Sequence, residues 1–195
     1  MKLNILLFLS TITLLTSCNG QTSNQNKNTD QFIKGDTVKE LGKSIMVVYQ
    51  DRKNFYWFGS WETGVYRYDG KTLINYTTKH GLQNNRIDEI TEDKSGNIWI
   101  GSNGDGLSLY SDGMFSHFGE EFGKDLVYAI NRQANGKYWV GTGNGIYEYD
   151  GENVSRAIGP ELFSSGFIMD IMTDKRGDVW IASFGGLHRW DGKTL

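Results

Sequence analysis

The chain has 195 residues, which is enough for one domain with a sizeable hydrophobic core. Its formal net charge is only −3 and no block of like charge occurs, which argues against a nucleic-acid-binding protein, because such proteins carry a basic stripe. A single proline, 25 glycines and 13% aromatic residues indicate short strands joined by tight turns.

The first segment has the pattern of an export signal. Lys2 precedes the apolar run Ile5–Leu15, which is too short to span a bilayer. The run ends in Leu15–Cys18 (LTSC), which resembles the lipobox of bacterial lipoproteins. That resemblance implies cleavage before Cys18 and attachment of lipid to its thiol. Several acyl chains anchor a protein stably in a membrane, whereas a single chain binds reversibly. An ordinary secretory signal is the alternative.

Residues 1–17 are therefore predicted to be a lipoprotein signal peptide, and residues 18–31 the lipidated Cys18 with a flexible tether. Asn19–Gln31 has no apolar residue, so burial cannot offset the entropy lost on ordering it. Asn19 does not resemble the aspartate that retains many lipoproteins at the inner membrane. We therefore expect an exported protein anchored in the outer membrane, on its periplasmic or its surface face.

The remainder, residues 32–195, consists of copies of one unit. Four tryptophans recur about 40 residues apart, and a period of this length is typical of solenoids and propellers. The recurrence indicates that these tryptophans are structural and pack between units. They are Trp57, Trp99, Trp139 and Trp180.

Each unit predicts four short strands, which we name a to d. Strand a alternates apolar and polar residues, as in Ile87–Ile90, and strand b carries the tryptophan. Strand c is followed by Asp-Gly, the strongest short signal for a hairpin, and strand d follows as in Leu73–Tyr76. The Asp-Gly pairs stand at Asp69-Gly70, Asp112-Gly113, Asp150-Gly151 and Asp191-Gly192.

The predicted fold is all-β, a β-propeller of four-stranded antiparallel blades with repeats at about 45–86, 87–126, 127–167 and 168–195. The fourth repeat stops at Leu195, where its strand d begins. Phe32–Ser44 has the length of the missing piece, so we expect it to complete that blade and close a four-bladed ring. The alternative is part of a larger or truncated propeller with an open edge that invites partner strands, including a second copy of the chain.

The repeats resemble the two-component regulator propeller, whose units run D-x-x-G-x-x-W-I-G-T-x-x-G-L-x-x-Y-D-G. The pattern is nearly complete in Asp93–Gly113 and Asp174–Gly192, and weakest in the first repeat, where Asn54 replaces the turn glycine. The resemblance implies the extracytoplasmic sensing part of hybrid histidine kinases, often glycan-responsive, or a stand-alone lipoprotein. Here four repeats replace the usual seven, and the sequence shows no second transmembrane span, kinase or response-regulator segment, so we expect that the chain does not transmit a signal across a membrane alone.

Ligands of propellers generally bind where the b–c turns and d–a connections meet, and loops on a rigid scaffold concentrate binding residues. Exposed aromatic rings there can stack on a sugar or anchor a partner, while amide, carboxylate and guanidinium groups supply hydrogen bonds. Solvated loops without a ligand are the alternative. The candidate binding residues are Trp61, Glu62, His80, Arg86, Asn103, Asp105, Asn144 and Phe184.

The stretch Gly96–Gly106 looks at first like a phosphate or calcium loop. Alignment with the other repeats indicates that its glycines are structural residues of the repeat. Gly101 is interpreted as replaceable because Ala182 stands in its place in the fourth repeat. Asp105 alone supplies too few carboxylates for calcium. Any site is therefore expected where the copies differ, at Asn103–Asp105.

Catalytic and metal motifs are not found in the sequence. His80, His117 and His188 fall in different parts of their repeats, so they share no register for a metal, and no cofactor is expected. The predicted function is therefore a non-catalytic, membrane-anchored module that binds or senses a glycan, small molecule or protein. A protein–protein interaction scaffold is the alternative. A propeller lyase with His80 as its base is a third, less favoured hypothesis.

Overall fold

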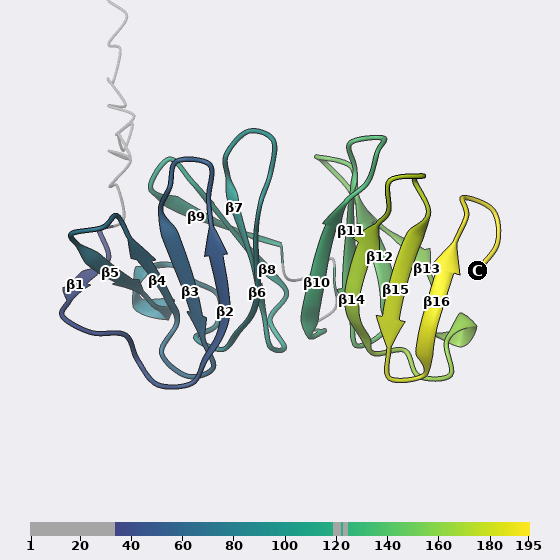
Figure 1. Cartoon of the computed structure of the whole chain (residues 1–195). Helices are drawn as coiled ribbons and strands as arrows, with labels where there is room; N and C mark the ends of the chain where they lie inside the picture. The colour runs from purple at the N-terminus through teal and green to yellow at the C-terminus, as the bar shows by residue number, and fades with distance from the viewer. Residues whose placement is uncertain (1–33, 119–121, 123–124) are drawn as a thin grey trace, which may run out of the picture. The chain divides into compact units, whose positions relative to one another are not determined.

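The computed structural model describes residues 34–118, 122 and 125–195 (Figure 1), so Cys18 and the predicted signal peptide lie outside the described residues. The regular structure is almost entirely antiparallel β-sheet, which confirms the predicted all-β class; the second and third sheets have the expected four strands, whereas the first has five and the fourth has three. Two short 3₁₀ helices interrupt the connections, η1 (Thr78–His80) and η2 (Pro160–Leu162). In the part of the chain that the structure describes, no helix is both long and apolar enough to cross a membrane.

Four sheets follow one another along the chain, and we call them blades 1 to 4. Blade 1 contains β2 (Ile45–Gln50), β3 (Tyr56–Ser60), β4 (Val65–Tyr68), β5 (Leu73–Tyr76) and the added strand β1 (Asp36–Val38). Blade 2 contains β6 (Ile87–Glu92), β7 (Ile98–Ser102), β8 (Leu107–Ser111) and β9 (Met114–Phe118). Blade 3 contains β10 (Val127–Arg132), β11 (Tyr138–Thr142), β12 (Gly145–Tyr149) and β13 (Val154–Ile158). Blade 4 contains β14 (Ile168–Thr173), β15 (Val179–Ser183) and β16 (Gly186–Trp190).

The N-terminal strand does not complete the fourth blade. β1 pairs antiparallel with β5, with Asp36 opposite Asn75 and Val38 opposite Leu73, and therefore extends the first blade. The expectation that this piece closes a four-bladed ring is thus wrong. β5 forms the edge of this sheet opposite to β2, and pairing with β1 occupies backbone groups that an edge strand leaves unpaired.

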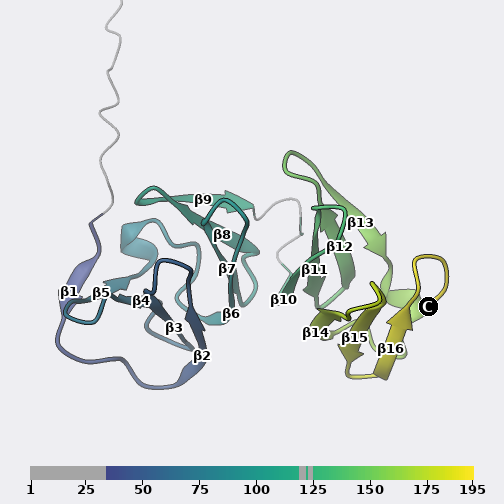
Figure 2. The same ribbon diagram turned by 45° about the horizontal axis from the view of Figure 1, so that its top comes forward.

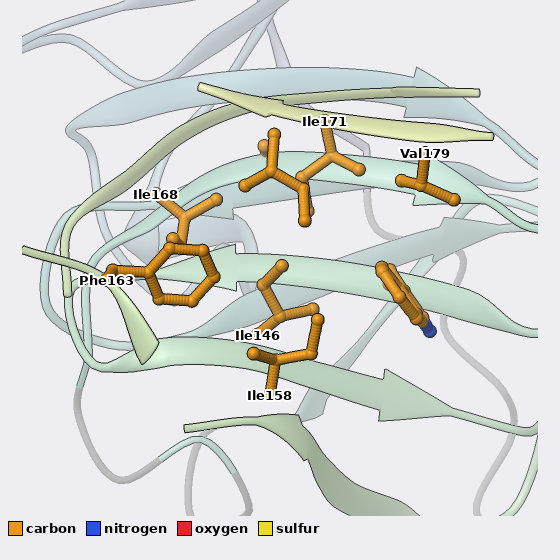
Figure 3. Close-up of a cluster of buried hydrophobic side chains, with 9 residues drawn as sticks. Ile146, Ile158, Phe163, Ile168, Ile171 and Val179 are labelled. Carbon is orange, nitrogen blue, oxygen red and sulfur yellow. The ribbon is translucent and has the colours of Figure 1, made fainter. Parts of the chain in front are cut away.

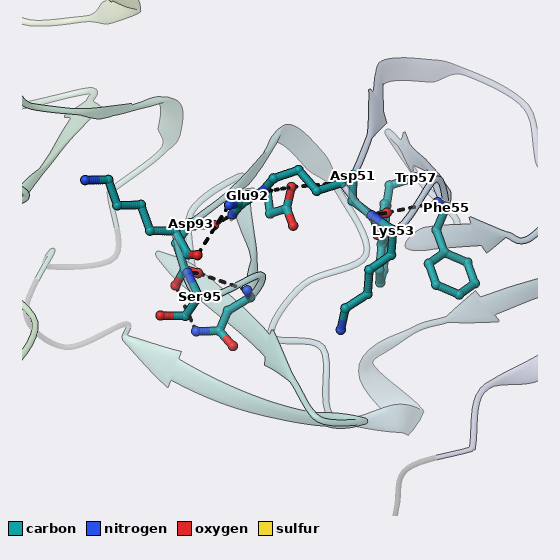
Figure 4. A network of polar contacts seen from close by, with 10 residues as sticks. Asp51, Lys53, Phe55, Trp57, Glu92, Asp93 and Ser95 are labelled. Carbon is teal, nitrogen blue, oxygen red and sulfur yellow. Dashed lines mark hydrogen bonds and ion pairs between the residues drawn. The ribbon is translucent and has the colours of Figure 1, made fainter.

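An aspartate fixes the turn between strands a and b and also holds the tryptophan. Asp51 Oδ1 accepts the backbone N–H groups of Lys53 and Phe55, each at 2.9 Å, while Oδ2 accepts Trp57 Nε1–H at 2.8 Å (Figure 4). Asp93 and Asp174 make the same bonds to their own turns and tryptophans. This repeated pattern accounts for the constant spacing of Asp and Trp in three of the four repeats.

Blade 3 obtains the same result with other residues. Gln133 stands where the other blades have aspartate, and Trp139 Nε1–H donates instead to Glu148 Oε2 at 3.2 Å. Lys137 holds that carboxylate from its other oxygen at 2.6 Å. The indole N–H is therefore paired in every blade, as burial of a polar group requires.

The hydrophobic core lies between the blades rather than within any one of them. Three clusters of buried side chains join blades 1 and 2, blades 2 and 3, and blades 3 and 4. In the third cluster Ile146 and Ile158 of blade 3 meet Ile168 and Ile171 of blade 4 (Figure 3). Each of the first three tryptophans belongs to the cluster shared with the following blade, so each is buried by its neighbour.

The glycine two residues after the tryptophan allows this close packing. A Cβ on Gly59 would lie 2.6 Å from Ile87 Cγ2, one on Gly101 2.9 Å from Val127 Cγ1, and one on Gly141 2.7 Å from Ile168 Cγ2. Each of these contacts joins a blade to the first residue of the next. The interpretation of Gly101 as replaceable is therefore wrong, because its equivalent in blade 4, Ala182, has no following blade against it in the described chain.

One inter-blade position carries a carboxyl group. Glu89 occupies the place that Val47 holds in blade 1 and Ala129 in blade 3, beside the close approach at Gly101. Burial, followed by the nearby charge of Asp170, raises the pKa of Glu89 to about 8. The folded chain therefore keeps this side chain protonated at neutral pH, whereas the unfolded chain ionises it.

Substitution of Gly101 by alanine tests the inter-blade contact. The added methyl group must displace Val127 or the backbone behind it, so we expect a loss of about 1–3 kcal/mol in the free energy of unfolding, measured in urea. Ser116→Ala, on the exposed face of the outer strand of the same blade, is the control and should change stability by less than about 0.5 kcal/mol. Equal effects from the two substitutions would contradict the close approach.

The pKa of Glu89 predicts a pH-dependent stability. Because the pKa is raised on folding, this group makes the folded chain progressively less stable as pH rises from about 4.5 to about 8. The variant Glu89→Gln should flatten this decline and be more stable than the parent by at least about 1 kcal/mol at pH 9, and little different at pH 4. Urea unfolding across this pH range provides the measurement, and a parallel pair of curves would show the assignment to be wrong.

Candidate functional site

Strand a of each blade (β2, β6, β10 and β14) carries a β-bulge at its second residue. The pairing with strand b skips one position in all four blades, between Ile45 and Val47 in blade 1 and at the equivalent places in the others. A bulge leaves one residue out of the ladder and redirects its side chain. The bulge residues are Met46, Asp88, Tyr128 and Met169.

These four side chains line one pocket, which we call the central pocket. Trp61, from the b–c turn of blade 1, and Arg86, from the connection into blade 2, complete its lining, and its volume is about 280 Å³. Figure 2 shows β6 of blade 2 beside β10 of blade 3, the strands that contribute Asp88 and Tyr128. Four sheets thus place one side chain each around a shared space.

Arg86 and Trp61 form a cation–π pair. The guanidinium carbon of Arg86 lies 4.1 Å from the centroid of the Trp61 ring, within the range in which such pairs are attractive. The indole remains 41% exposed, so an apolar surface is available beside the cation. This pair joins the b–c turn of blade 1 to the connection that leads into blade 2.

Asp88 and the b–c turn of blade 2 are held by a network of hydrogen bonds. Asn103 Nδ2 donates to Asp88 Oδ2 at 3.2 Å, and Asn103 N–H donates to the carbonyl of Arg86 at 3.1 Å. Asn84 Nδ2 donates to Asp105 Oδ2 at 2.6 Å, while Asn84 Oδ1 accepts the N–H of Arg86 at 2.9 Å. These bonds order the loops before any ligand binds, which lowers the entropic cost of binding.

The electrostatics of the central pocket are set by one cation, one carboxyl group and one phenol. Burial raises the pKa of Asp88, although the hydrogen bond from Asn103 and the charge of Arg86 act in the opposite direction. Burial, together with the negative charge of Asp88, raises the pKa of Tyr128, so its hydroxyl remains a neutral donor. The pocket therefore offers an acceptor, a donor and a cation, together with the apolar surfaces of Met46, Met169 and Trp61.

Arg86, which lines the central pocket, has one guanidinium nitrogen in a buried position. Its Nε–H is buried and has no hydrogen-bond partner among the described residues. An unpaired buried donor carries a desolvation cost that an acceptor on a ligand, or a water molecule, would remove.

Three other candidate residues lie in the b–c turns of their blades, outside the lining of the central pocket. Glu62 is exposed next to Trp61, and Asn144 hydrogen-bonds through its side chain to Asp125. Phe184 is 70% exposed and stacks on Phe167, with ring centroids 5.6 Å apart.

His80 lies elsewhere in blade 1. It ends η1 and is buried, and its Nδ1 accepts the backbone N–H of Thr77 at 3.1 Å. Its Nε2 is 3.5 Å from Asp36 Oδ2 on β1, and its ring meets Tyr76 edge to face. Both ring nitrogens therefore face partners of blade 1, and His80 is not part of the lining of the central pocket.

The bulge residues were missed by reasoning from the sequence. The sequence predicts the strand a positions as a simple alternation, in which Asp88 is only one of two polar residues between Ile87 and Ile90. The sequence nevertheless contains an indication of the site. The second residue of strand a changes in chemical character between blades, whereas the first and fourth residues of the strand are always isoleucine or valine. The second position of strand a, at which the repeats differ, is thus the position that lines the central pocket.

Comparison with known proteins places this architecture among the propellers. Residues 81–104 match the family described as "Two component regulator propeller". No curated protein sequence is similar enough to the chain to be matched. Among solved structures, the chain is similar to the extracellular domain of a protein from B. thetaiotaomicron that is described as a hybrid two component system, with TM-score 0.63, 23% identity and coverage of 79% of this chain and 24% of that one.

Two further structures share the fold at lower identity. One is virginiamycin B lyase from Staphylococcus aureus, with TM-score 0.62, 12% identity and coverage of 80% of this chain and 58% of the lyase. The other is the WD40 beta propeller domain of Doa1, with TM-score 0.61, 16% identity and coverage of 77% of this chain and 51% of that one. The chain thus spans about a quarter of the first structure and about half of the other two. Residues 81–104 are a two component regulator propeller repeat, and the described chain has the fold of a β-propeller.

Proposed function

We propose that the chain is a non-catalytic sensing module that is exported, anchored in the outer membrane through lipid on Cys18, and binds a small ligand in the central pocket. The observation that carries this proposal is the set of bulge residues. Four structurally equivalent positions present three residue types to one space, methionine in blades 1 and 4, aspartate in blade 2 and tyrosine in blade 3, although the surrounding framework repeats. The strand b tryptophan, by contrast, is the same residue in all four blades.

The lining suggests the class of ligand. The Arg86 guanidinium group and the Tyr128 hydroxyl suit oxygen acceptors, Asp88 suits a hydroxyl or amine donor, and Trp61 suits an apolar ring face. A hydroxyl-rich ring, such as a sugar unit of a glycan, combines these properties in a molecule of suitable size. Another small polar molecule with one flat face would satisfy the same groups.

Two considerations support a sensing rather than a catalytic role. Residues 81–104 match a family whose name is that of two component regulators, and the chain shares its fold with the extracellular domain of a protein described as such a system. The histidine that the lyase hypothesis requires, His80, is held against Asp36 and Thr77 in blade 1. The likeness to the staphylococcal lyase is one of fold, at 12% identity.

Ligand binding can be tested by calorimetry of the purified chain against a panel of glycans and small polar molecules. For a ligand that binds, Asp88→Asn and Trp61→Ala should each weaken affinity at least about tenfold, because each removes a charge-assisted hydrogen bond or a stacking surface. Glu62→Gln, which changes an exposed carboxylate next to Trp61, is the matched control and should leave affinity unchanged.

Two results would refute the pocket assignment. One is binding that survives both pocket variants, and the other is the absence of binding across the panel together with a protein that co-purifies with the chain. The second result would favour the interaction scaffold instead.

The membrane anchor has its own experiment. When the full chain is expressed in a Gram-negative host that receives radiolabelled palmitate, label should appear on the parent chain and sediment with outer membranes. Cys18→Ser should abolish the label and release the chain from the membranes, whereas Ser17→Ala should retain both. Release of an unlabelled parent chain would favour the ordinary secretory signal.

A further inference from the structure

Each blade has two faces, and two faces of the described chain remain uncovered. We call the face toward the following blade the trailing face, and the face toward the preceding blade the leading face. The trailing faces of blades 1, 2 and 3 are covered by blades 2, 3 and 4 in the three core clusters. The trailing face of blade 4 and the leading face of blade 1 have no such neighbour among the described residues.

The trailing face of blade 4 has the residues of a buried face in an exposed setting. Leu187 is 68% exposed, whereas its equivalents Val65, Leu107 and Ile146 are each fully buried, at 0%. Trp180 is only half-buried, whereas the other three tryptophans are fully buried in the cluster with the next blade. Met172, on the same blade, is 54% exposed.

The leading face of blade 1 shows the complementary pattern. Val48 is 61% exposed, whereas the equivalent isoleucines of blades 2 to 4 are 2–8% exposed and belong to the three clusters. Tyr56 is 41% exposed, whereas Ile98 and Val179 at its position are buried. Ile45 is half-buried, although its equivalents are fully buried at 0%.

These two faces are the two halves of an interface that the chain already forms three times. We propose that two copies of the chain bind head to tail, so that the trailing face of blade 4 in one copy covers the leading face of blade 1 in the other. If both such contacts form, the pair has twofold symmetry and closes a ring of eight blades, which lies within the usual range for propellers. The surface buried is a face of each sheet, and no strand edge takes part.

The chain lengths of two related propellers agree with a second copy of this chain as the binding partner. The described blades align with 58% of the staphylococcal lyase and 51% of the WD40 propeller, so these proteins have about twice the length that aligns with one copy. A second copy would therefore bring the assembly to about the length of each of these two propellers, whereas the B. thetaiotaomicron extracellular domain, of which the chain covers 24%, is longer. No additional type of contact is needed, because Trp180 and Leu187 would occupy the places that Trp57 and Val65 occupy between blades 1 and 2.

Polar residues at the edge of the two faces are also compatible with the proposed contact between copies. Between blades 1 and 2, the backbone N–H and Nε–H of Arg52 donate to Glu92 Oε2, at 3.0 and 3.1 Å (Figure 4). In the proposed contact Lys175 takes the place of Arg52 and Gln50 the place of Glu92. A lysine ammonium group donates to a glutamine carbonyl oxygen, so the position keeps a donor opposite an acceptor.

One position makes the contact between copies looser than the contacts within a copy. Ala182 stands where the other blades have glycine, and its methyl group would meet Ile45, as a Cβ on Gly59 would meet Ile87 at 2.6 Å. The copies must therefore stand slightly further apart than consecutive blades do. Association should be reversible and dependent on concentration, and Ala182→Gly should strengthen it several-fold.

The test is the mass of the purified chain by sedimentation equilibrium over a range of concentrations. We expect a species of twice the chain mass of 22.1 kDa. Leu187→Asp and Val48→Asp should each give a monomer with an unchanged circular dichroism spectrum and thermal midpoint, because both side chains are exposed in the single copy. Leu162→Asp, which changes an equally exposed leucine of η2 outside both faces, is the control and should remain a dimer.

Mixing the two monomeric variants distinguishes head-to-tail pairing from other arrangements. Leu187→Asp retains an intact leading face and Val48→Asp an intact trailing face, so an equimolar mixture should regain one contact and form a mixed dimer. A symmetric contact between two trailing faces would leave Val48→Asp dimeric on its own. A parent chain that stays monomeric at every soluble concentration, or a dimer that neither substitution disrupts, would overturn the proposal.

Discussion

The structure depends on one constraint, which is that a blade of four short strands cannot bury both of its faces by itself. The buried side chains accordingly gather in clusters between consecutive blades, and each cluster contains the strand b tryptophan of the earlier blade. The indole N–H must be paired in that position, and the aspartate of the preceding turn accepts it in three blades. These bonds, with those from the turn, hold the pKa of Asp174 at about 2, so the acceptor stays ionised at physiological pH.

The same constraint explains which parts of the fold are predictable from the sequence. The tryptophan period, the Asp-Gly turns and the alternation of strand a are local patterns repeated four times, and each repetition supports the others. The position of β1 is not local in this sense. Asp36–Val38 has no counterpart in the repeats, so its pairing depends on which sheet edge is free nearby, and only the structure shows that β5 provides that edge. The glycine after the tryptophan was misjudged for a related reason, because its requirement arises from the following blade.

The residues of the candidate site likewise fall into those that the sequence locates and those that only the structure locates. Trp61, Arg86, Asn103 and Asp105 lie in turns and connections that the repeat alignment locates, and the structure joins them by a cation–π contact and hydrogen bonds. Asp88 and Tyr128 are inside strands, and their direction depends on a bulge in the pairing with strand b. A bulge depends on the register of two strands, and a single sequence does not specify that register. His80 shows the opposite case, a residue in a predicted connection that is held within blade 1.

The repeat therefore separates stability from recognition at neighbouring positions of one strand. The residues that flank a bulge, such as Ile87 and Ile90, pack against another blade and are restricted to apolar types. The bulge residue between them is outside the ladder and faces the central pocket, so its replacement removes no inter-blade contact of the core. Glu89 lies on the packing side and is kept protonated by burial. The chain can consequently vary Met46, Asp88, Tyr128 and Met169 to suit a ligand while the framework stays constant.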